Sequence, residues 1–397
     1  MPLPFLPVVL AGATAFLDLY ATQPLLPMLA RTFGASPFHV GLTITVPTVA
    51  VAIVAPFAGR LADAIGLRRV IVGAAALLTV ATALAATSRS LNELLFWRLV
   101  QGILTPGVFA STVAYIHDVW PAERAGRVTA AYVSGTVVGG FVGRLVAGLV
   151  ATHLDWHVSF LALAVLNAVA ALVLWRLLPD ERALGIAPHS HVTHAPRGAV
   201  GRLWADRRLA AAFIVGFCVL FTQVAMFTYV TFHAAAPPFG LSTVALGWLF
   251  AVYLVGAVAT PFGGHLVDTV GHRSGLAWAM GIAGFGALVT LLPSIAAIVI
   301  GLALCATGVF IAQATTSSFI GAVTTRDRGL AIGMYSSLYY AGGSAGAALP
   351  ALVWTRGGWL ACVGLVVVVQ AFAAVVALTR WGNGQVPRAP SALSLEP

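Results

Sequence analysis

Charged side chains inside long apolar segments are the residues of this sequence best suited to chemistry. Asp18 is the only acidic residue deep inside such a segment, and Arg98 and Arg144 are the basic ones. A charge that is removed from water is costly unless it is paired or faces a polar cavity. Burial favours the neutral form of a carboxyl group, whereas a nearby arginine favours the charged form. A carboxylate that meets water and arginine in turn could therefore bind and release protons.

We hypothesise from this pattern that Asp18 is a proton-coupling group and that Arg98 and Arg144 set its affinity for the proton. The alternative is a fixed ion pair that holds helices together. The sequence leaves open whether the three side chains meet in space, because they lie in separate apolar segments.

The composition indicates what surrounds these charges. Hydrophobic residues make up 60% of the chain and charged residues only 8%, whereas soluble domains carry about 25% charged residues. Apolar stretches that suit a helix of about 20 residues, the length that crosses a lipid bilayer, recur along the sequence. The composition therefore predicts an all-α, multi-pass integral membrane protein. We expect twelve transmembrane helices, at residues 5–29, 39–59, 70–88, 92–116, 126–150, 157–178, 209–233, 242–264, 275–293, 295–321, 329–354 and 358–380.

The placement of arginine predicts the orientation of these helices. The 21 basic residues are all arginine, and the net charge is +9. An excess of arginine in alternate loops marks the cytoplasmic side of a membrane. With the N-terminus inside, sixteen of the 21 arginines fall in cytoplasmic loops or the tail, and three fall outside. We therefore expect both termini in the cytoplasm, a lipid bilayer as partner and no nucleic acid. The first apolar stretch lacks a basic leader and a cleavage site, so we expect a retained helix.

Two internal repeats predict two six-helix halves. The segment APFAGRLADAIGLRRV from Ala55 matches TPFGGHLVDTVGHRSG from Thr260 at an offset of 205, with seven identities in sixteen positions. A second set recurs at an offset of 203, in which Gly139 and Gly143 match Gly342 and Gly346. Duplicated bundles with a solute site between them are one transporter architecture. We expect an N-terminal bundle at residues 1–178, a cytoplasmic linker at 179–208, a C-terminal bundle at 209–381 and a disordered tail at 382–397.

The loop after the second predicted span carries the most specific motif, and it is the point at which a family resemblance emerges. It resembles the Gly-x-Leu-Ala-Asp-Arg-x-Gly-Arg-Lys/Arg loop of the major facilitator superfamily. The first span, which reads LDLYATQPLLP with Pro24 and Pro27 toward its outer end, resembles the first helix of the twelve-span drug:proton antiporter branch of that family. In that family the loop is thought to latch the two halves in the outward-facing state. Ala64 and Leu67 stand where the family has basic residues, which thins the ionic network. The resemblance implies a gating loop with these residues: Gly59, Asp63, Gly66, Arg68, Arg69, Asp268 and Arg273.

Two further segments resemble motifs of the same superfamily. Arg98, followed by Gln101 and Gly102, resembles a motif whose membrane-embedded arginine is associated with proton transfer. The fifth span resembles the antiporter motif G-x8-G-x3-G-P-x2-G-G, with Gly140 and Arg144 in place of the expected proline and final glycine. Small residues at this spacing also allow close helix contact without any transport role. The glycines that match the motif are Gly126, Gly135, Gly139 and Gly143.

Polar side chains within the predicted spans are tentative cavity residues. They are Gln23, Gln101, Gln223, Tyr229, Gln313, Tyr335 and Tyr339. The second half has no charge inside a span, which favours a neutral, lipophilic or sugar-like solute. We expect no metal site. The histidines of the linker are expected to belong to a flexible segment, and the three cysteines are expected to pack as apolar residues. Their spacing does not resemble a metal-ligand pattern.

The resemblance implies a secondary active transporter of the bacterial inner membrane. We expect a monomeric, proton-coupled efflux antiporter that moves small organic solutes, drug-like or sugar-like, by alternating access. Its partners would be the small-molecule substrate and protons, and its energy source the proton gradient rather than a cofactor. The alternatives are a proton-coupled uptake symporter for a nutrient and a membrane receptor that does not transport. The sequence has no catalytic cluster and no nucleotide-binding loop, so we do not expect an enzyme.

Overall fold

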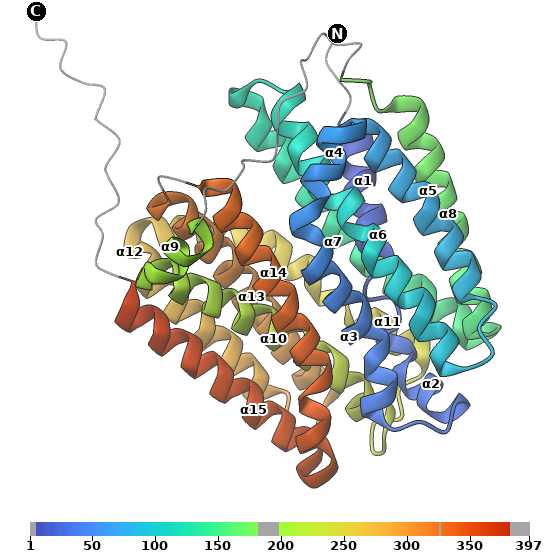
Figure 1. The fold of residues 1–397 in the computed structure, drawn as a ribbon. Helices are drawn as coiled ribbons and strands as arrows, with labels where there is room; N and C mark the ends of the chain where they lie inside the picture. The colour runs from blue at the N-terminus through green and yellow to red at the C-terminus, as the bar shows by residue number, and fades with distance from the viewer. Residues whose placement is uncertain (1–4, 182–197, 325–326, 382–397) are drawn as a thin grey trace, which may run out of the picture.

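A computed structural model describes residues 5–181, 198–324 and 327–381, and the regular structure in these ranges is helical throughout (Figure 1). The predicted tail and most of the predicted linker lie outside these ranges, as do the side chains of Asp63 and Asp268. In chain order the helices are α1 (Leu6–Leu17), η1 (Gln23–Leu25), α2 (Leu26–Thr32), α3 (Pro37–Val54), η2 (Ala55–Phe57), α4 (Ala58–Ile65), α5 (Leu67–Ala85), α6 (Leu91–Val119), α7 (Ala122–His153), α8 (Trp156–Leu177), α9 (Ala199–Ala205), α10 (Arg207–Ala235), α11 (Thr243–Leu249), α12 (Val252–Val289), α13 (Ile295–Val323), α14 (Arg328–Ala348) and α15 (Pro350–Arg380).

Polar residues at the ends of the apolar segments fix where several helices begin. Ser36, Ser90 and Asp206 each accept a hydrogen bond from a main-chain N–H in the first turn of the helix that follows. Such caps satisfy donors that the helix itself leaves without a partner. The ends of α3, α6 and α10 are therefore encoded locally.

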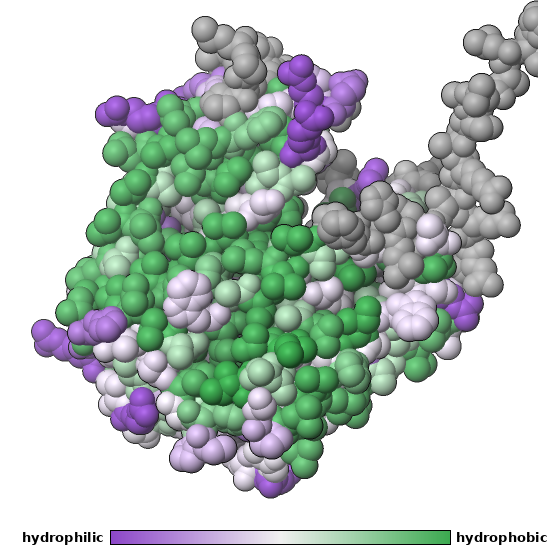
Figure 2. Space-filling model, turned by 180° about the vertical axis from the view of Figure 1, so that it is seen from behind, coloured by the Kyte–Doolittle hydropathy of each residue, from purple (hydrophilic) through white to green (hydrophobic). Residues whose placement is uncertain are grey.

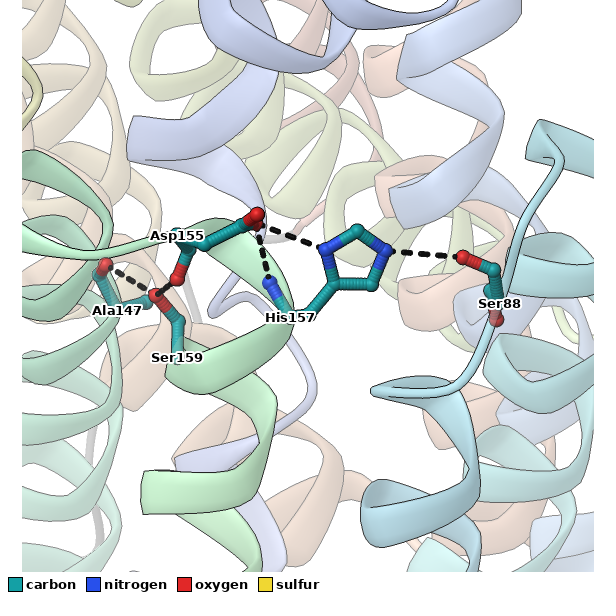
Figure 3. Close-up of polar contacts among 5 residues, drawn as sticks. All are labelled: Ser88, Ala147, Asp155, His157 and Ser159. Atoms are coloured by element: carbon teal, nitrogen blue, oxygen red, sulfur yellow. Dashed lines mark hydrogen bonds and ion pairs between the residues drawn. The ribbon is translucent and has the colours of Figure 1, made fainter.

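The start of α8 is tied to two neighbouring segments by a small polar cluster (Figure 3). Asp155 caps α8 by accepting a hydrogen bond from the main-chain N–H of His157 at 2.9 Å, and it also contacts the imidazole Nδ1 at 2.8 Å. The other ring nitrogen of His157 lies 3.1 Å from the carbonyl oxygen of Ser88 in the loop before α6. Ser159 donates to the carbonyl oxygen of Ala147 in α7 at 3.0 Å. These contacts join α7, α8 and the loop after α5 at one end of the molecule.

Glycines break two of the long helices at the predicted loop positions. Gly271 in α12 has φ 81°, and Gly358 in α15 has φ 53°. These left-handed conformations are accessible to glycine at little cost. The breaks fall between the predicted eighth and ninth spans and at the start of the predicted twelfth, so each of these long helices contains parts of two predicted spans.

The helices before and after the linker pack mainly within their own group. In the first group α1 packs on α7 and α5 packs on α6, whereas in the second α10 packs on α14 and α12 packs on α13. The main contacts between the groups join α3 to α14 and α7 to α11, and Figure 1 shows the groups side by side.

The predicted repeat is visible in matching helix contacts. A Cβ at Gly12 would fall against Tyr132 of α7, and a Cβ at Gly216 would fall against Tyr335 of α14. These are equivalent pairs, because Gly216 lies 204 residues after Gly12 and Tyr335 lies 203 after Tyr132. The sequence repeat therefore corresponds to a repeated packing of two helices.

The surface of the protein is apolar over a wide area (Figure 2). Large exposed side chains such as Ile53, Val165, Phe285 and Val368 belong to helices of both groups. Soluble monomers rarely expose apolar patches of this extent. In the described residues, nine stretches have the length and hydropathy of a membrane-crossing helix, and α1 is a shorter apolar helix. An all-helical integral membrane protein agrees with these findings, and the number of twelve crossings stays a prediction.

Candidate functional site

The first apolar segment is interrupted beside Asp18, and the interruption creates a polar site. α1 ends at Leu17, and the chain continues in tight turns to η1. The N–H of Gln23 donates to the carbonyl oxygen of Tyr20, three residues back, at 3.1 Å. In a continuous α-helix that N–H would donate to Leu19. The turn therefore leaves carbonyl groups that need other donors.

Arg98 of α6 supplies these donors. Its guanidinium donates to the carbonyl oxygens of Asp18 at 2.9 Å and of Thr43 at 2.8 Å, and also to that of Leu19. A further hydrogen bond of 2.6 Å reaches Oε1 of Gln101. Arg98 is fully buried. It is therefore a positioning residue that holds the broken first segment in place.

The carboxylate of Asp18 has its own set of partners. Its Oδ2 accepts hydrogen bonds from Thr82 at 2.8 Å and from the side-chain amide of Asn167 at 2.6 Å. Within the part of the chain that the structure describes, its buried Oδ1 has no hydrogen-bond partner, and the same is true of Oδ1 of Asn167. Among the described residues, no ion pair joins Arg98 to this carboxylate. The alternative, a fixed ion pair, has no such contact between these two side chains in this conformation.

This arrangement leaves one oxygen of a buried acid open to a proton. A buried charged oxygen without a partner is unfavourable. A proton on Oδ1 of Asp18 would neutralise the charge without displacing Thr82 or Asn167 from Oδ2. Oδ1 of Asp18 is therefore a candidate position for reversible protonation.

Arg144 lies elsewhere, between the two groups of helices. Its Nε donates to Oε1 of Gln23 at 2.7 Å and its Nη1 to the carbonyl oxygen of Gly140 at 2.6 Å. The structure thus brings Asp18 and Arg98 together at the main chain, but within the described residues Arg144 has no contact with the Asp18 carboxylate.

Comparison with known proteins identifies the architecture that holds this site. Residues 8–244 and 231–395 match the family described as Major Facilitator Superfamily. The chain belongs to the Major Facilitator Superfamily. The MFS-type transporter YybF of Bacillus subtilis is 30% identical over 380 residues, covering 95% of this chain and 92% of that protein. The inner membrane transport protein YnfM of Escherichia coli is 30% identical over 353 residues, covering 88% of this chain and 83% of that protein.

A solved structure agrees with this assignment at the level of the fold. A bacterial homologue of the human lysosomal transporter Spinster, in an inward-facing and occupied conformation, superposes with a TM-score of 0.77 at 16% identity. The match covers 95% of this chain and 96% of that one. As a superfamily member, this chain is a multi-pass membrane transporter of a small molecule and not an enzyme.

The glycines that resemble the superfamily's antiporter motif form the contact between α7 and α1. A Cβ at Gly135, Gly139 or Gly143 would overlap the main chain of α1, at Val9, Ala13 and Leu17 respectively. Gly126 has no atom within 4 Å of the corresponding position. Three of the four glycines therefore hold α7 against the helix that carries Asp18, which is also what close packing alone requires.

The predicted gating loop is described in part. Gly66 has φ 99°, which favours glycine, and a Cβ there would lie 2.8 Å from a carboxylate oxygen of Glu181. Arg68 donates to the carbonyl oxygens of Leu178 at 2.7 Å and Trp175 at 2.6 Å, so it caps the end of α8. Arg69 is exposed and Arg273 is half-buried. Gly59 lies in the first turn of α4.

The tentative cavity residues fall into two groups. Gln101 belongs to the Asp18 network, where its amide donates to Thr82 at 2.8 Å, and Tyr229 donates to Ala347 within the second half at 2.9 Å. Of the others, Gln23 lies at the boundary between the halves. Gln23 bonds Arg144 and also donates to Thr228 of α10 at 3.1 Å. Gln223 and Gln313 are half-buried, and Tyr335 and Tyr339 are buried on α14.

Several site residues carried no clear signal in the sequence. Thr82 and Asn167 bond the Asp18 carboxylate, and Tyr20, Phe250 and Tyr253 surround Arg144. Of these residues, Asn167 was the easiest to predict, because a side-chain amide inside an apolar span needs a partner.

Proposed function

We propose that this chain is a proton-coupled efflux antiporter of the drug:proton type, which moves small organic solutes by alternating access. The observation that carries the proposal is the Asp18 carboxylate: buried in a broken span, held at Oδ2 and unpartnered at Oδ1. Ionisable groups held in such positions inside a membrane are typical of proton pathways. The proton gradient would supply the energy, without a cofactor.

The coupling step follows from the two forms of this carboxyl group. In the charged form, Oδ1 of Asp18 is left without a donor. The access state in which water can reach this oxygen is then favoured. In the neutral form the charge is removed, and the closed site beside Arg98 costs less. Substrate and proton would thus bias opposite access states, since each shifts the equilibrium only by its differential affinity.

The proposed topology is that of twelve spans in two six-helix bundles, at residues 1–178 and 209–381, with both termini in the cytoplasm. The arginine distribution supports this orientation and a bacterial inner membrane. We further propose that the protein works as a monomer.

We further infer, under this topology, that the structure represents a state in which the outer side is closed. Hydrogen bonds between the halves, from Gln23 to Thr228 and from Ser344 to Thr48, lie in the outer portions of the predicted spans. Gly148 lies against Thr243 in the same region. In the opposite, outward-facing state the gating loop with Asp63 and Asp268 would join the halves at the cytoplasmic side.

The experiment that tests antiport is uptake into everted membrane vesicles that are acidified inside. An exporter accumulates its substrate in these vesicles, and Asp18→Asn removes the dependence on the pH gradient. Accumulation only with the gradient reversed would instead identify an uptake symporter. No flux of any compound, with full tolerance of Asp18→Asn, would identify a receptor.

A further inference from the structure

Arg144 is a buried cation that pairs with no acidic side chain among the described residues. Its two hydrogen bonds go to neutral oxygens, on Gln23 and Gly140, and its Nη2 has no hydrogen bond within that part of the chain. Arg144 is 4% exposed, whereas Arg98 is 0% exposed and each of its three guanidinium nitrogens donates to at least one oxygen. A buried charge that lacks a partner is costly. Its retention is explained if a ligand supplies the missing negative charge.

Aromatic rings from both halves of the protein enclose this cation. The guanidinium carbon lies 4.7 Å from the ring centre of Phe250 and 5.1 Å from those of Tyr20 and Tyr253. Tyr20 belongs to the first half, and the other two rings to the second. Such rings stabilise a cation and exclude water, which strengthens any ion pair formed there. Two rings of the second half thus contact a positively charged side chain of the first half, although no predicted span of the second half carries a charge.

A row of aromatic side chains leads away from Arg144. The carbonyl oxygen of Gly140 accepts from Arg144, and a Cβ at Gly140 would lie 3.9 Å from the Cβ of Phe16. Ring centres follow at 6.3 Å from Phe16 to Phe109, 5.8 Å from Phe109 to Tyr340 and 5.6 Å from Tyr340 to Tyr339. Phe16 and Phe109 are half-buried and lie in the first half, whereas the tyrosines lie in α14. We call Phe16, Phe109, Tyr340 and Tyr339 the aromatic row.

From these contacts we propose that the transported solute is an amphipathic organic anion, whose carboxylate binds Arg144 and whose apolar or aromatic body lies on the aromatic row. Arginine is well suited to the carboxylate, because its planar donors bind two oxygens at once. Offset stacking on the ring faces suits an aromatic body. The inference rests on the proposed transport function. It assigns an acidic solute, whereas the sequence alone favoured a neutral one.

The location of Arg144 links binding of this anion to the closed outer side. Gln23 accepts from Arg144 and donates to Thr228 across the halves. A carboxylate at Arg144 would compete with Gln23 for the guanidinium and so release the Gln23 amide from its bridging position. Binding of substrate would therefore weaken one of the contacts that hold the outer side closed.

Paired acids and amides of equal shape test the proposal directly. Binding to the purified protein is measured by calorimetry at neutral pH for benzoate with benzamide, 1-naphthoate with 1-naphthamide, and 4-phenylbutyrate with its amide. In wild type at least one acid should bind about tenfold or more tightly than its amide, since removing one partner of a buried charge pair has effects of this size. Equal binding of acid and amide in all three pairs would overturn the proposal without any mutant.

Variants then assign the preference to Arg144. Arg144→Gln should lower binding of the acid to the level of the amide and leave binding of the amide unchanged, and Arg144→Lys should restore part of the preference. Tyr340→Leu should weaken both members of a pair while keeping their ratio. Arg127→Gln, an exposed arginine on the same helix, is the control. An acid preference that survives in folded Arg144→Gln would contradict the assignment.

The proposed function is judged by a separate readout. Gradient-driven flux of a neutral or cationic compound, without acid binding, would sink the anion proposal and leave antiport intact. Tight binding of an acid that depends on Arg144, without any flux that responds to the pH gradient, would instead sink proton antiport.

Discussion

The guanidinium of Arg98 donates to the main-chain carbonyl oxygen of Asp18 at 2.9 Å and leaves the carboxylate of Asp18 to Thr82 and Asn167. The arginine thus holds the backbone of the proposed proton site, while one carboxylate oxygen of Asp18 accepts no hydrogen bond from the described residues. This division of roles allows the carboxyl group to change charge without breaking the contacts that fix its position. A direct ion pair would have to break at every cycle.

Replacement of Arg98 should affect stability as well as transport. Arg98→Gln leaves carbonyl oxygens of Asp18, Leu19 and Thr43 without their donors, and each buried acceptor left unsatisfied costs about 1 to 3 kcal/mol. We expect a clear fall in the thermal midpoint of the detergent-purified protein. Arg127→Gln, at an exposed position, should leave the midpoint unchanged. An unaltered midpoint in Arg98→Gln would contradict the positioning role.

The glycines of α7 provide a matched pair of substitutions. Gly143→Ala introduces a methyl group that overlaps the carbonyl oxygen of Leu17, whereas Gly126→Ala adds one where no atom lies within 4 Å. Overpacking of this kind costs about 1 to 3 kcal/mol. Gly143→Ala should lower both the thermal midpoint and the transport rate, and Gly126→Ala should change neither. Similar effects of the two variants would show that α1 and α7 do not pack in this way.

Closure of the outer side can be tested with a disulfide. Ser344 Oγ donates to Thr48 Oγ1 at 2.9 Å across the halves, so Thr48→Cys combined with Ser344→Cys should oxidise readily with a membrane-permeant oxidant. The cross-link should stop transport, and reduction should restore it. The native cysteines Cys218, Cys305 and Cys362 are buried and free, and each single-cysteine variant serves as a control. Normal transport by the fully cross-linked protein would show that this contact does not need to open.

The cluster at the start of α8 predicts a specific pH dependence. Burial raises the pKa of Asp155, but the hydrogen bonds from His157 outweigh it and hold that pKa below its ordinary value. A lowered pKa means that the carboxylate stabilises the fold above the ordinary pKa and loses this effect as the pH falls through the lowered value. Asp155→Asn keeps the cap but removes the charge, so this variant should be only slightly less stable than wild type. The difference in stability should disappear only in strong acid, where the carboxylate of the wild type also loses its charge. Asp155→Ala also removes the cap and should cost about 0.5 to 2 kcal/mol more. A difference between Asp155→Asn and wild type that grows on acidification would contradict this sign.

The sequence singled out the buried polar site around Asp18 only as far as a single residue can. Asp18 stood out because no other acid lies deep in an apolar span, and the glycines of the fifth span were recognisable by their spacing. Thr82 was hidden, because threonines in membrane helices commonly bond their own backbone, as Thr82 also does to Leu78. The partners of Arg144 could not be predicted from the sequence, because they depend on which face of α7 packs against α11. This contact is formed only when the two halves pack together.

The repeats carried more structural information than any single motif. The offset that matched Gly139 with Gly342 and Gly143 with Gly346 also relates their contacts, since Gly342 and Gly346 lie against α10 as Gly139 and Gly143 lie against α1. The break of the first span was not predicted, because residues 5–29 were expected to form one continuous helix, whereas the structure divides them into α1, η1 and α2. Pro24 and Pro27 favour it, but its exact position depends on the donors that Arg98 brings from α6.

Proton release on substrate binding is the most direct test of the coupling role of Asp18. The purified wild-type protein in weakly buffered detergent solution should release protons when a transported compound is added, and Asp18→Asn should bind the compound with no proton release. Asp155→Asn, an acid outside the membrane site, should release protons as wild type does. Proton release of equal size from folded Asp18→Asn would contradict the account, because the proton would then come from another group.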